Sequence, residues 1–153
     1  MNYWLMKSEP DAFSIDDLQQ RPKQTEHWDG VRNYQARNML RDALQVGDQV
    51  FFYHSNCATP GIVGLMEVVR AGYPDHTAFA PQSKYFDPKS DPQAPRWFMV
   101  DIKYLRHTRR VISLAELKGH EALENMQLVR KGNRLSIMPV SQAEWQYILQ
   151  LEG

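Results

Sequence analysis

The apolar and polar positions of this chain form short blocks that predict a mixture of strands and helices. Apolar runs at 2–7, 49–55 and 62–69, and alternation through 96–107, are typical of strands. Capping residues and helical spacing predict helices after Ser14, at about 33–44 and after Ser141, with shorter ones at 113–117 and 120–123. Residues 134–139 predict a further strand. With neighbouring strands joined by hairpins, the pattern favours an α+β fold, a mixed or antiparallel β-barrel flanked by α-helices.

Two segments of this pattern suggest a binding surface. In residues 49–55, Phe51, Tyr53 and Ser55 share one face of a strand while Phe52 and His54 share the other, so one face can meet the core and the other can line a pocket. Residues 71–95 hold five of the nine prolines and predict a long ordered excursion with at most a helical turn near Phe79. Loops of this length are commonly functional rims.

Length and charge limit the class of protein. A chain of 153 residues is expected to form a single domain spanning 1–153. Its 18 basic and 18 acidic side chains cancel, so any binding to nucleic acid requires a local basic patch. The single cysteine, Cys57, fits a reducing compartment. No apolar run is long enough for a membrane span or a signal peptide, which predicts a cytoplasmic protein without a membrane partner.

The segment from 28 to 38, WDGVRNYQARN, has the composition of a recognition surface. Trp28 and Tyr34 offer flat faces, and three side-chain amides, including Asn33, offer both donors and acceptors. A planar ligand with hydrogen-bonding edges, such as a nucleobase, is the natural complement. The competing interpretation makes Trp28 a core residue and Arg32 part of a solvated helix face, and for this segment alone it is the commoner outcome.

Motifs for catalysis and for metal or nucleotide binding are absent from the sequence. The five histidines and Cys57 do not occur at metal-ligand spacing, so no metal or other cofactor is expected. Neither glycine-rich phosphate loop occurs, and the nucleophile elbow is missing. His54 and Ser55 make a poor catalytic pair, because adjacent strand residues point to opposite faces. A binding constellation remains, formed by Trp4, Lys7 and Ser8, the 28–38 segment and residues 52–55.

Several motifs together carry a resemblance to a known family. They are WLMKSEP at 4–10, WDGVRNYQARN at 28–38, FFYHSN at 51–56, PGIVGLMEVV at 60–69, YPDHTAF at 73–79 and RLSIMPVS at 134–141. In order and over nearly the whole chain, they resemble the EVE domain family. The resemblance implies a PUA-like barrel, related to YTH and ASCH domains, in which a pocket at the barrel mouth receives a modified base. The positions that resemble the pocket segments are Trp4, Lys7, Ser8, Trp28, Asn33, Tyr34, Tyr53, His54, Ser55, Arg134, Leu135 and Ser136.

We therefore expect a non-enzymatic module that binds nucleic acid, DNA or RNA, through a modified base. C5-modified cytosine in DNA is the first choice, with Trp28 stacking on the flipped base and the protein acting as a monomer. The expected phosphate contacts are Arg32, Arg106, Arg109, Arg110 and Arg130. The alternative is an enzyme, or a subunit of an enzyme complex, that acts on a modified base, a nucleotide or RNA. The chain begins at the first predicted strand without a basic tail, which favours a compact, bacterial-type cytoplasmic protein over a nuclear one.

Overall fold

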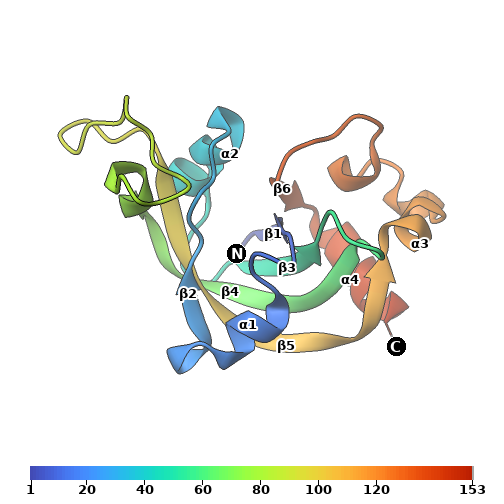
Figure 1. The fold of residues 1–153 in the computed structure, drawn as a ribbon. Helices are drawn as coiled ribbons and strands as arrows, with labels where there is room; N and C mark the ends of the chain where they lie inside the picture. The colour runs from blue at the N-terminus through green and yellow to red at the C-terminus, as the bar shows by residue number, and fades with distance from the viewer. Residues whose placement is uncertain (153) are drawn as a thin grey trace.

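A curved six-stranded sheet forms the centre of the computed structural model, which describes residues 1–152 (Figure 1). Its strands are β1 (Tyr3–Ser8), β2 (Thr25–His27), β3 (Gln49–His54), β4 (Gly61–Pro74), β5 (Phe98–Ser113) and β6 (Ile137–Val140). They lie in the order β2-β5-β4-β3-β1-β6. Strand β1 runs parallel to β3, and the other pairs are antiparallel. The predicted mixed α+β architecture is confirmed, with an open sheet whose edge strands β2 and β6 do not pair with each other.

Short helices connect these strands. They are α1 (Ile15–Gln20), α2 (Tyr34–Asn38), α3 (Leu114–Lys118) and α4 (Gln142–Leu151), with a π-helical turn at Met39–Ala43 and 3-10 turns at Pro22–Gln24, His76–Phe79, Glu121–Leu123 and Gln127–Val129. The predicted capping boxes are confirmed, because Ser14 and Ser141 each exchange hydrogen bonds with the acid three residues later. The helix predicted over 33–44 is confirmed in position, but it changes to π-helical geometry at Met39.

The sequence pattern missed β2 and underestimated two other strands. Strand β2 lies in a stretch expected to be a polar loop, and all three of its residues are only partly buried. It pairs with β5 at the edge of the sheet, where backbone hydrogen bonds require no alternation of apolar side chains. Strand β4 continues to Pro74, inside the predicted excursion, and β5 continues to Ser113. The predicted helical turn near Phe79 is confirmed.

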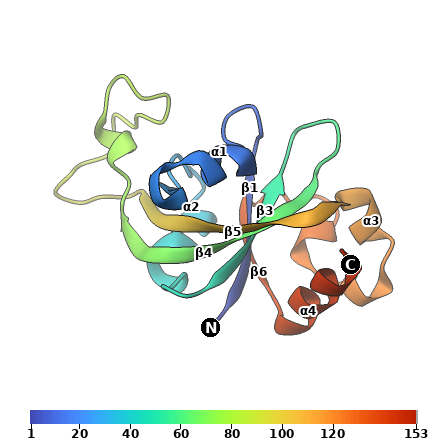
Figure 2. The ribbon, with the colours of Figure 1, turned by 90° about the horizontal axis from the view of Figure 1, so that it is seen from below.

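Hydrophobic cores lie on both sides of the central strands. Val50 and Phe52 of β3 join the core that includes residues of α1 and α2, while Phe51 and Tyr53 join the core that includes residues of α3 and α4. Figure 2 shows these two helix pairs at opposite ends of the long β4–β5 hairpin. Both faces of β3 therefore meet a core, and the expected pocket lining on one face is provided by Tyr53 alone, which also lines a cavity.

A buried carboxylate fixes the start of the sheet. The Asp48 side chain accepts hydrogen bonds from the backbone N–H groups of Asn2 and Gln45 and from the indole Nε1–H of Trp4, each at 3.0 Å. Trp4 is only 6% exposed. This network ties β1 to the turn that precedes β3, and it places the Trp4 indole in the core beside Asp48. Trp4 was expected in the base pocket, but in the structure its indole N–H is bonded to Asp48 and stabilises the fold.

Replacing Asp48 by alanine is expected to destabilise the protein, because three donors, one of them the buried indole N–H, lose their acceptor. Each buried donor left without a partner costs about 1–3 kcal/mol. Trp4→Phe removes one of those donors, so the double variant should lose less stability than the two single losses combined. Chemical denaturation of the four proteins measures this coupling. Strict additivity of the two losses would contradict the network, and Asp11→Ala, at an exposed position, is the control.

Candidate functional site

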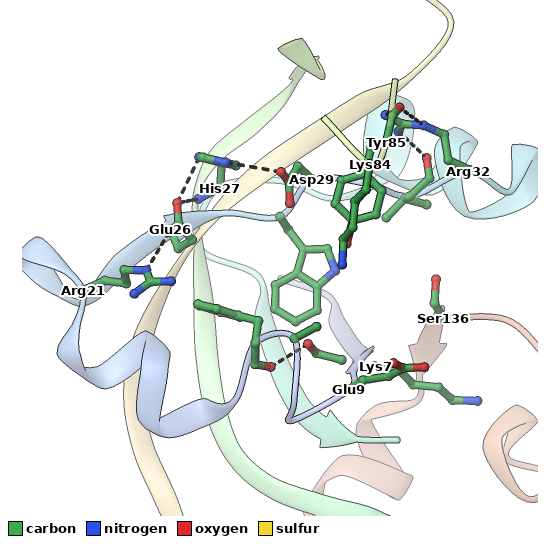
Figure 3. Close-up of a pocket in the computed structure, with 16 residues that line it drawn as sticks. Lys7, Glu9, Arg21, Glu26, His27, Asp29, Arg32, Lys84, Tyr85 and Ser136 are labelled. Carbon is green, nitrogen blue, oxygen red and sulfur yellow. Dashed lines mark hydrogen bonds and ion pairs between the residues drawn. The ribbon is translucent and has the colours of Figure 1, made fainter. Parts of the chain in front are cut away.

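A cavity of about 590 Å³ opens at the end of β1, between the segment after α1 and the long excursion that follows β4 (Figure 3). Its lining residues come from the end of β1, the turn before α1, β2 with the 28–32 loop, the excursion and the start of β6. They are Lys7, Ser8, Glu9, Ala12, Phe13, Arg21, Glu26, His27, Trp28, Asp29, Gly30, Val31, Arg32, Lys84, Tyr85 and Ser136. Its volume lies within the roughly 300–1,000 Å³ typical of small-ligand sites.

Trp28 forms a fixed aromatic wall of this cavity. Its backbone N–H donates to the carbonyl of Val100 on β5 at 2.8 Å. Its ring packs edge-to-face with Phe52 at 5.4 Å and Phe13 at 6.2 Å between ring centroids. The Trp28 side chain is therefore both a member of the core and a lining residue of the cavity. The interpretation of Trp28 as a core residue is confirmed, and its role in recognition stays a prediction that its place in the cavity wall allows.

The indole nitrogen of Trp28 is free to donate. The indole N–H groups of Trp4 and Trp97 donate to the carboxylates of Asp48 and Asp87. Within residues 1–152, Trp28 Nε1 forms no hydrogen bond. The atom is also not completely buried, so a ligand or water can reach it. A ligand in the cavity is the remaining source of an acceptor besides water.

Tyr85 closes the cavity because it packs directly on Gly30. Gly30 has φ +77°, and a Cβ atom there would lie 2.5 Å from Tyr85 Cζ, so only glycine allows this approach. Gly30 N–H donates to Asp75 Oδ2 at 2.8 Å. Arg32 donates to the same oxygen at 3.1 Å and to the carbonyl of Tyr85 at 2.7 Å. The excursion is thereby attached to the 28–32 loop, and Tyr85 is held at the rim.

Asp75, the carboxylate at the centre of this attachment, remains ionised although it is fully buried. Burial by itself raises the pKa of Asp75, but hydrogen bonds from Thr77, Gly30 and Arg32 outweigh it and hold the pKa below its usual range. The guanidinium of Arg32 is engaged with this carboxylate and with the backbone. Arg32, predicted as a phosphate contact, therefore acts in this structure as a brace between two loops.

Of the three acids that line the cavity, Asp29 is the least engaged. Glu26 accepts from the Arg21 side chain and from the backbone N–H of His27, and Glu9 accepts from Asn56. The side chain closest to forming an ion pair with Asp29 is the imidazole of His27, with Nε2 3.6 Å from Oδ2. Burial, with a smaller contribution from neighbouring carboxylates, raises the pKa of Asp29. An ionised Asp29 would gain from a hydrogen-bond donor on a ligand.

Four of the predicted pocket residues, Lys7, Ser8, Trp28 and Ser136, line the cavity. The Ser8 hydroxyl donates to the carbonyl of Phe13 at 2.6 Å, so its proton is already used. Burial lowers the pKa of Lys7. The Lys7 side chain extends away from the cavity in Figure 3, and its ammonium lies 5.7 Å from the centre of the Tyr53 ring. Lys7 therefore contributes to the surface on both sides of the end of β1.

Two predicted residues of β3 lie beside this cavity and do not line it. The N–H of Ile15 donates to His54 Nε2 at 3.1 Å, and burial lowers the pKa of His54, so its neutral form caps the start of α1. Tyr53 lies in the second core and lines a different cavity, and its buried hydroxyl has a pKa raised to about 12. Ser55, which follows β3, contributes a backbone hydrogen bond to the carbonyl of Ser8.

The remaining predicted pocket residues also lie outside the cavity. Asn33 caps α2, where its side-chain oxygen accepts from the N–H of Ala36 at 3.0 Å. Tyr34 stacks on Trp97 with ring centroids 4.8 Å apart, and it is 52% exposed. Leu135 packs against the second core, and Arg134 is exposed. Motif position alone could not separate residues that face the cavity from residues that shape its walls.

Two of the predicted phosphate contacts bind acids of the protein itself. Arg106 makes a bidentate pair with Glu152 at 2.9 and 2.7 Å. Arg110 makes another with Glu116 at 2.6 and 2.8 Å. Both pairs attach helices to β5, which provides a structural use for these side chains. Arg109 is exposed, and Arg130 lines the second cavity.

Eleven of the sixteen lining residues were not among the predicted site residues, and Asp29, Tyr85 and Phe13 are three of them. Asp29 lies inside the segment 28–38 singled out from sequence, but no role was assigned to its side chain. Tyr85 lies in the excursion predicted to be a functional rim, and that loop was the available signal. Phe13 carried no signal, because nothing in the sequence distinguishes it from an ordinary core aromatic residue.

Membrane-spanning helices and clusters of metal ligands are both absent from residues 1–152. No helix there combines the length and the apolar character needed to cross a membrane. No group of three or more histidine, cysteine, aspartate or glutamate side chains in the same residues is arranged to hold a metal ion.

Known proteins share this sequence and this arrangement of elements. The sequence model of the EVE domain family matches residues 2–151 of this chain. Human thymocyte nuclear protein 1 is 49% identical over 99% of this chain and 74% of its own length. A crystal structure of a Pseudomonas syringae protein is 49% identical with a TM-score of 0.94 over 99% of both chains. The crystal structure of human THYN1 protein in complex with DNA containing 5-methylcytosine is 48% identical with a TM-score of 0.95, over 99% of this chain and 98% of that one. The chain therefore belongs to the EVE domain family.

Proposed function

We propose that this protein binds nucleic acid through a modified base, with 5-methylcytosine in DNA as the first choice. The observation that carries the proposal is the cavity itself, in which Trp28 presents a fixed aromatic wall with an unpaired N–H, and which Asp29 also lines with a weakly paired carboxylate. A base must leave its stack to enter such a cavity, and this costs a few kcal/mol, less in single strands. The crystal structure of human THYN1 protein in complex with DNA that contains 5-methylcytosine supports this choice of base.

Asp29 is the residue we assign to the edge of the base. The exocyclic amino group of cytosine is a donor, and carboxylates are its usual partners among side chains. Thymine carries the same methyl group as 5-methylcytosine but presents an oxygen acceptor in place of the amino group. An ionised Asp29 therefore favours 5-methylcytosine over thymine, while the apolar wall accounts for the methyl group.

Binding without chemistry is the activity we propose for this cavity. The Ser8 hydroxyl donates to a backbone carbonyl, and no lining base accepts its proton. The alternative, an enzyme acting on a modified base, a nucleotide or RNA, predicts turnover. Mass spectrometry of a modified oligonucleotide incubated with the protein distinguishes the two, because a reader returns it unchanged.

We further propose that the protein acts as a monomer in the cytoplasm. Cys57 is a free thiol, which suits a reducing compartment. RNA is the second polymer to test, because the residues assigned here are proposed to contact the base and not the sugar. Matched DNA and RNA strands with one modified cytosine compare the two polymers directly.

The methyl group is expected to contribute a modest preference. Burying one additional carbon is worth about 0.8 kcal/mol, or about a fourfold difference in affinity. Competition between matched single-stranded oligonucleotides that carry 5-methylcytosine or cytosine measures this ratio. Equal affinities would leave a general nucleic-acid binder and would contradict the proposal.

Trp28→Phe is expected to weaken binding of the modified strand roughly three- to tenfold, because a smaller ring keeps only part of the stacking worth about 1–3 kcal/mol per base. Trp28→Ala is a poorer test, because removing a core aromatic side chain costs about 3–5 kcal/mol of stability. Trp97→Phe is the matched control, because Trp97 is similarly buried but does not line the cavity. Unchanged affinity of Trp28→Phe with normal folding would show that this ring does not stack on the base.

Asp29→Ala is expected to reduce the preference for 5-methylcytosine over thymine by roughly 10- to 100-fold, the value of a hydrogen bond to a charged group. Asp29→Asn keeps a carbonyl acceptor and should retain part of the preference. In the wild type, the base binds the ionised carboxylate. Affinity is therefore highest above the raised pKa of Asp29 and falls as the pH drops through it.

The pH dependence separates the two Asp29 variants from the wild type. Asparagine does not titrate, so the affinity of Asp29→Asn should stay level where that of the wild type declines. Binding titrations with both oligonucleotides between neutral and acidic pH provide the measurement. Identical profiles for wild type and Asp29→Asn would remove Asp29 from the site.

A further inference from the structure

A second cavity, of about 560 Å³, lies on the other side of the end of β1. Lys7 and Tyr53 form its boundary with the sheet, and Lys118 of α3 lines it. The 128–133 segment, which includes Arg130 and Lys131, completes the wall. Lys7 also lines the first cavity, the one with Trp28 and Asp29, which is called the base cavity from here on. The two cavities are therefore neighbours.

Unpaired positive charge concentrates in this second cavity. Its lining contains four cations, Lys7, Lys118, Arg130 and Lys131, against one acid, Glu124. The chain as a whole has no net charge, with 18 basic and 18 acidic residues, so the concentration is local. None of the four cations forms an ion pair with an acid of residues 1–152, whereas Arg21 and Arg32 of the base cavity do.

The shape of the 128–133 segment allows an extended ligand to approach. Gly132 has φ +81°, and no atom lies within 4 Å of the position that a Cβ would take there, so the turn is open to the outside. The side chain of Asn133 fixes this turn, because its amide donates to the carbonyl of Gln127 and its oxygen accepts from the N–H of Leu135 at 2.9 Å. Arg130 and Lys131 are thus presented on a turn with fixed ends.

Lys7 is a partly buried cation that lies between the two cavities. Desolvation lowers its pKa, and a nearby anion would favour its charged form again. Figure 3 shows its side chain leading from the base cavity outward. A strand whose base enters the first cavity therefore has the second cavity next to it, because Lys7 lines both.

We propose that the second cavity binds the phosphodiester backbone of the strand whose modified base occupies the first cavity, an inference that rests on the proposed function. Cations that neutralise phosphates release counterions, so each contact makes the affinity fall more steeply with salt. The binding surface for the backbone is then this cavity and not the arginines of β5, of which Arg106 and Arg110 are paired with acids.

Lys118→Gln and Lys131→Gln together test the proposal, because both side chains are exposed and neither is needed for the base cavity. Binding of a single-stranded 5-methylcytosine oligonucleotide is measured over a range of salt concentrations. The slope of log affinity against log salt should decrease by about 0.7 for each lysine–phosphate pair that the substitutions remove from a single strand. The ratio between modified and plain cytosine should stay the same. Lys23→Gln with Lys89→Gln, exposed lysines outside both cavities, is the matched control.

The possible outcomes separate this inference from the proposed function. A wild-type salt slope in the Lys118/Lys131 variant, together with a normal preference for the modified base, overturns the backbone site and leaves the base cavity in place. A reduced slope in the control variant also overturns it, because the charge effect would then be general. If the wild type shows no preference for the modified base, but its salt slope still decreases in the Lys118/Lys131 variant, only the proposed function is contradicted. A Glu124→Gln variant provides the opposite change and should bind more tightly.

Discussion

The buried carboxylate of Asp75 holds together two of the segments that line the cavity proposed to bind the base. It accepts hydrogen bonds from Gly30 and Arg32 on one loop and from Thr77 at the base of the other. Without this group, the 28–32 loop would keep the hydrogen bonds from Arg32 to Tyr85 and Thr77 but would lose those that join Gly30 and Arg32 to Asp75. A buried ion requires compensation, and the surrounding donors are numerous enough to keep Asp75 charged. The cavity is thus shaped before a ligand arrives, which reduces the ordering cost of binding.

The cations of this protein fall into two groups with different uses. Arginines such as Arg32, Arg106 and Arg110 form close pairs with acids of the chain and fasten loops and helices to the sheet. Lysines and Arg130 around the second cavity remain without acidic partners within residues 1–152. A chain of zero net charge can therefore present a positive groove, because four cations and one acid line this cavity while the chain as a whole has equal numbers of both. Salt sensitivity is then expected from a local surface and not from the overall charge.

Sequence patterns predicted the elements of the fold better than the geometry of the site. Alternation and capping residues identified the strands and helices, because these signals are local. Strand β2 was missed because an edge strand of polar residues has no apolar alternation. Motif position correctly predicted that Trp28 and Ser136 line the cavity, but it also predicted Trp4 and Asn33, which do not line it. Trp4 donates to Asp48, a contact 44 residues away that depends on the three-dimensional arrangement, whereas Asn33 caps the start of α2.

The proposed function requires a modified cytosine to leave its stack and enter the cavity beside Trp28 and Asp29. A crystal structure of this protein with a short single-stranded oligonucleotide carrying one 5-methylcytosine tests it most directly. We expect the base in contact with the Trp28 ring, with its amino group within hydrogen-bond distance of the Asp29 carboxylate. A bound strand whose modified base remains stacked on its neighbours, with the cavity empty, would contradict the proposal.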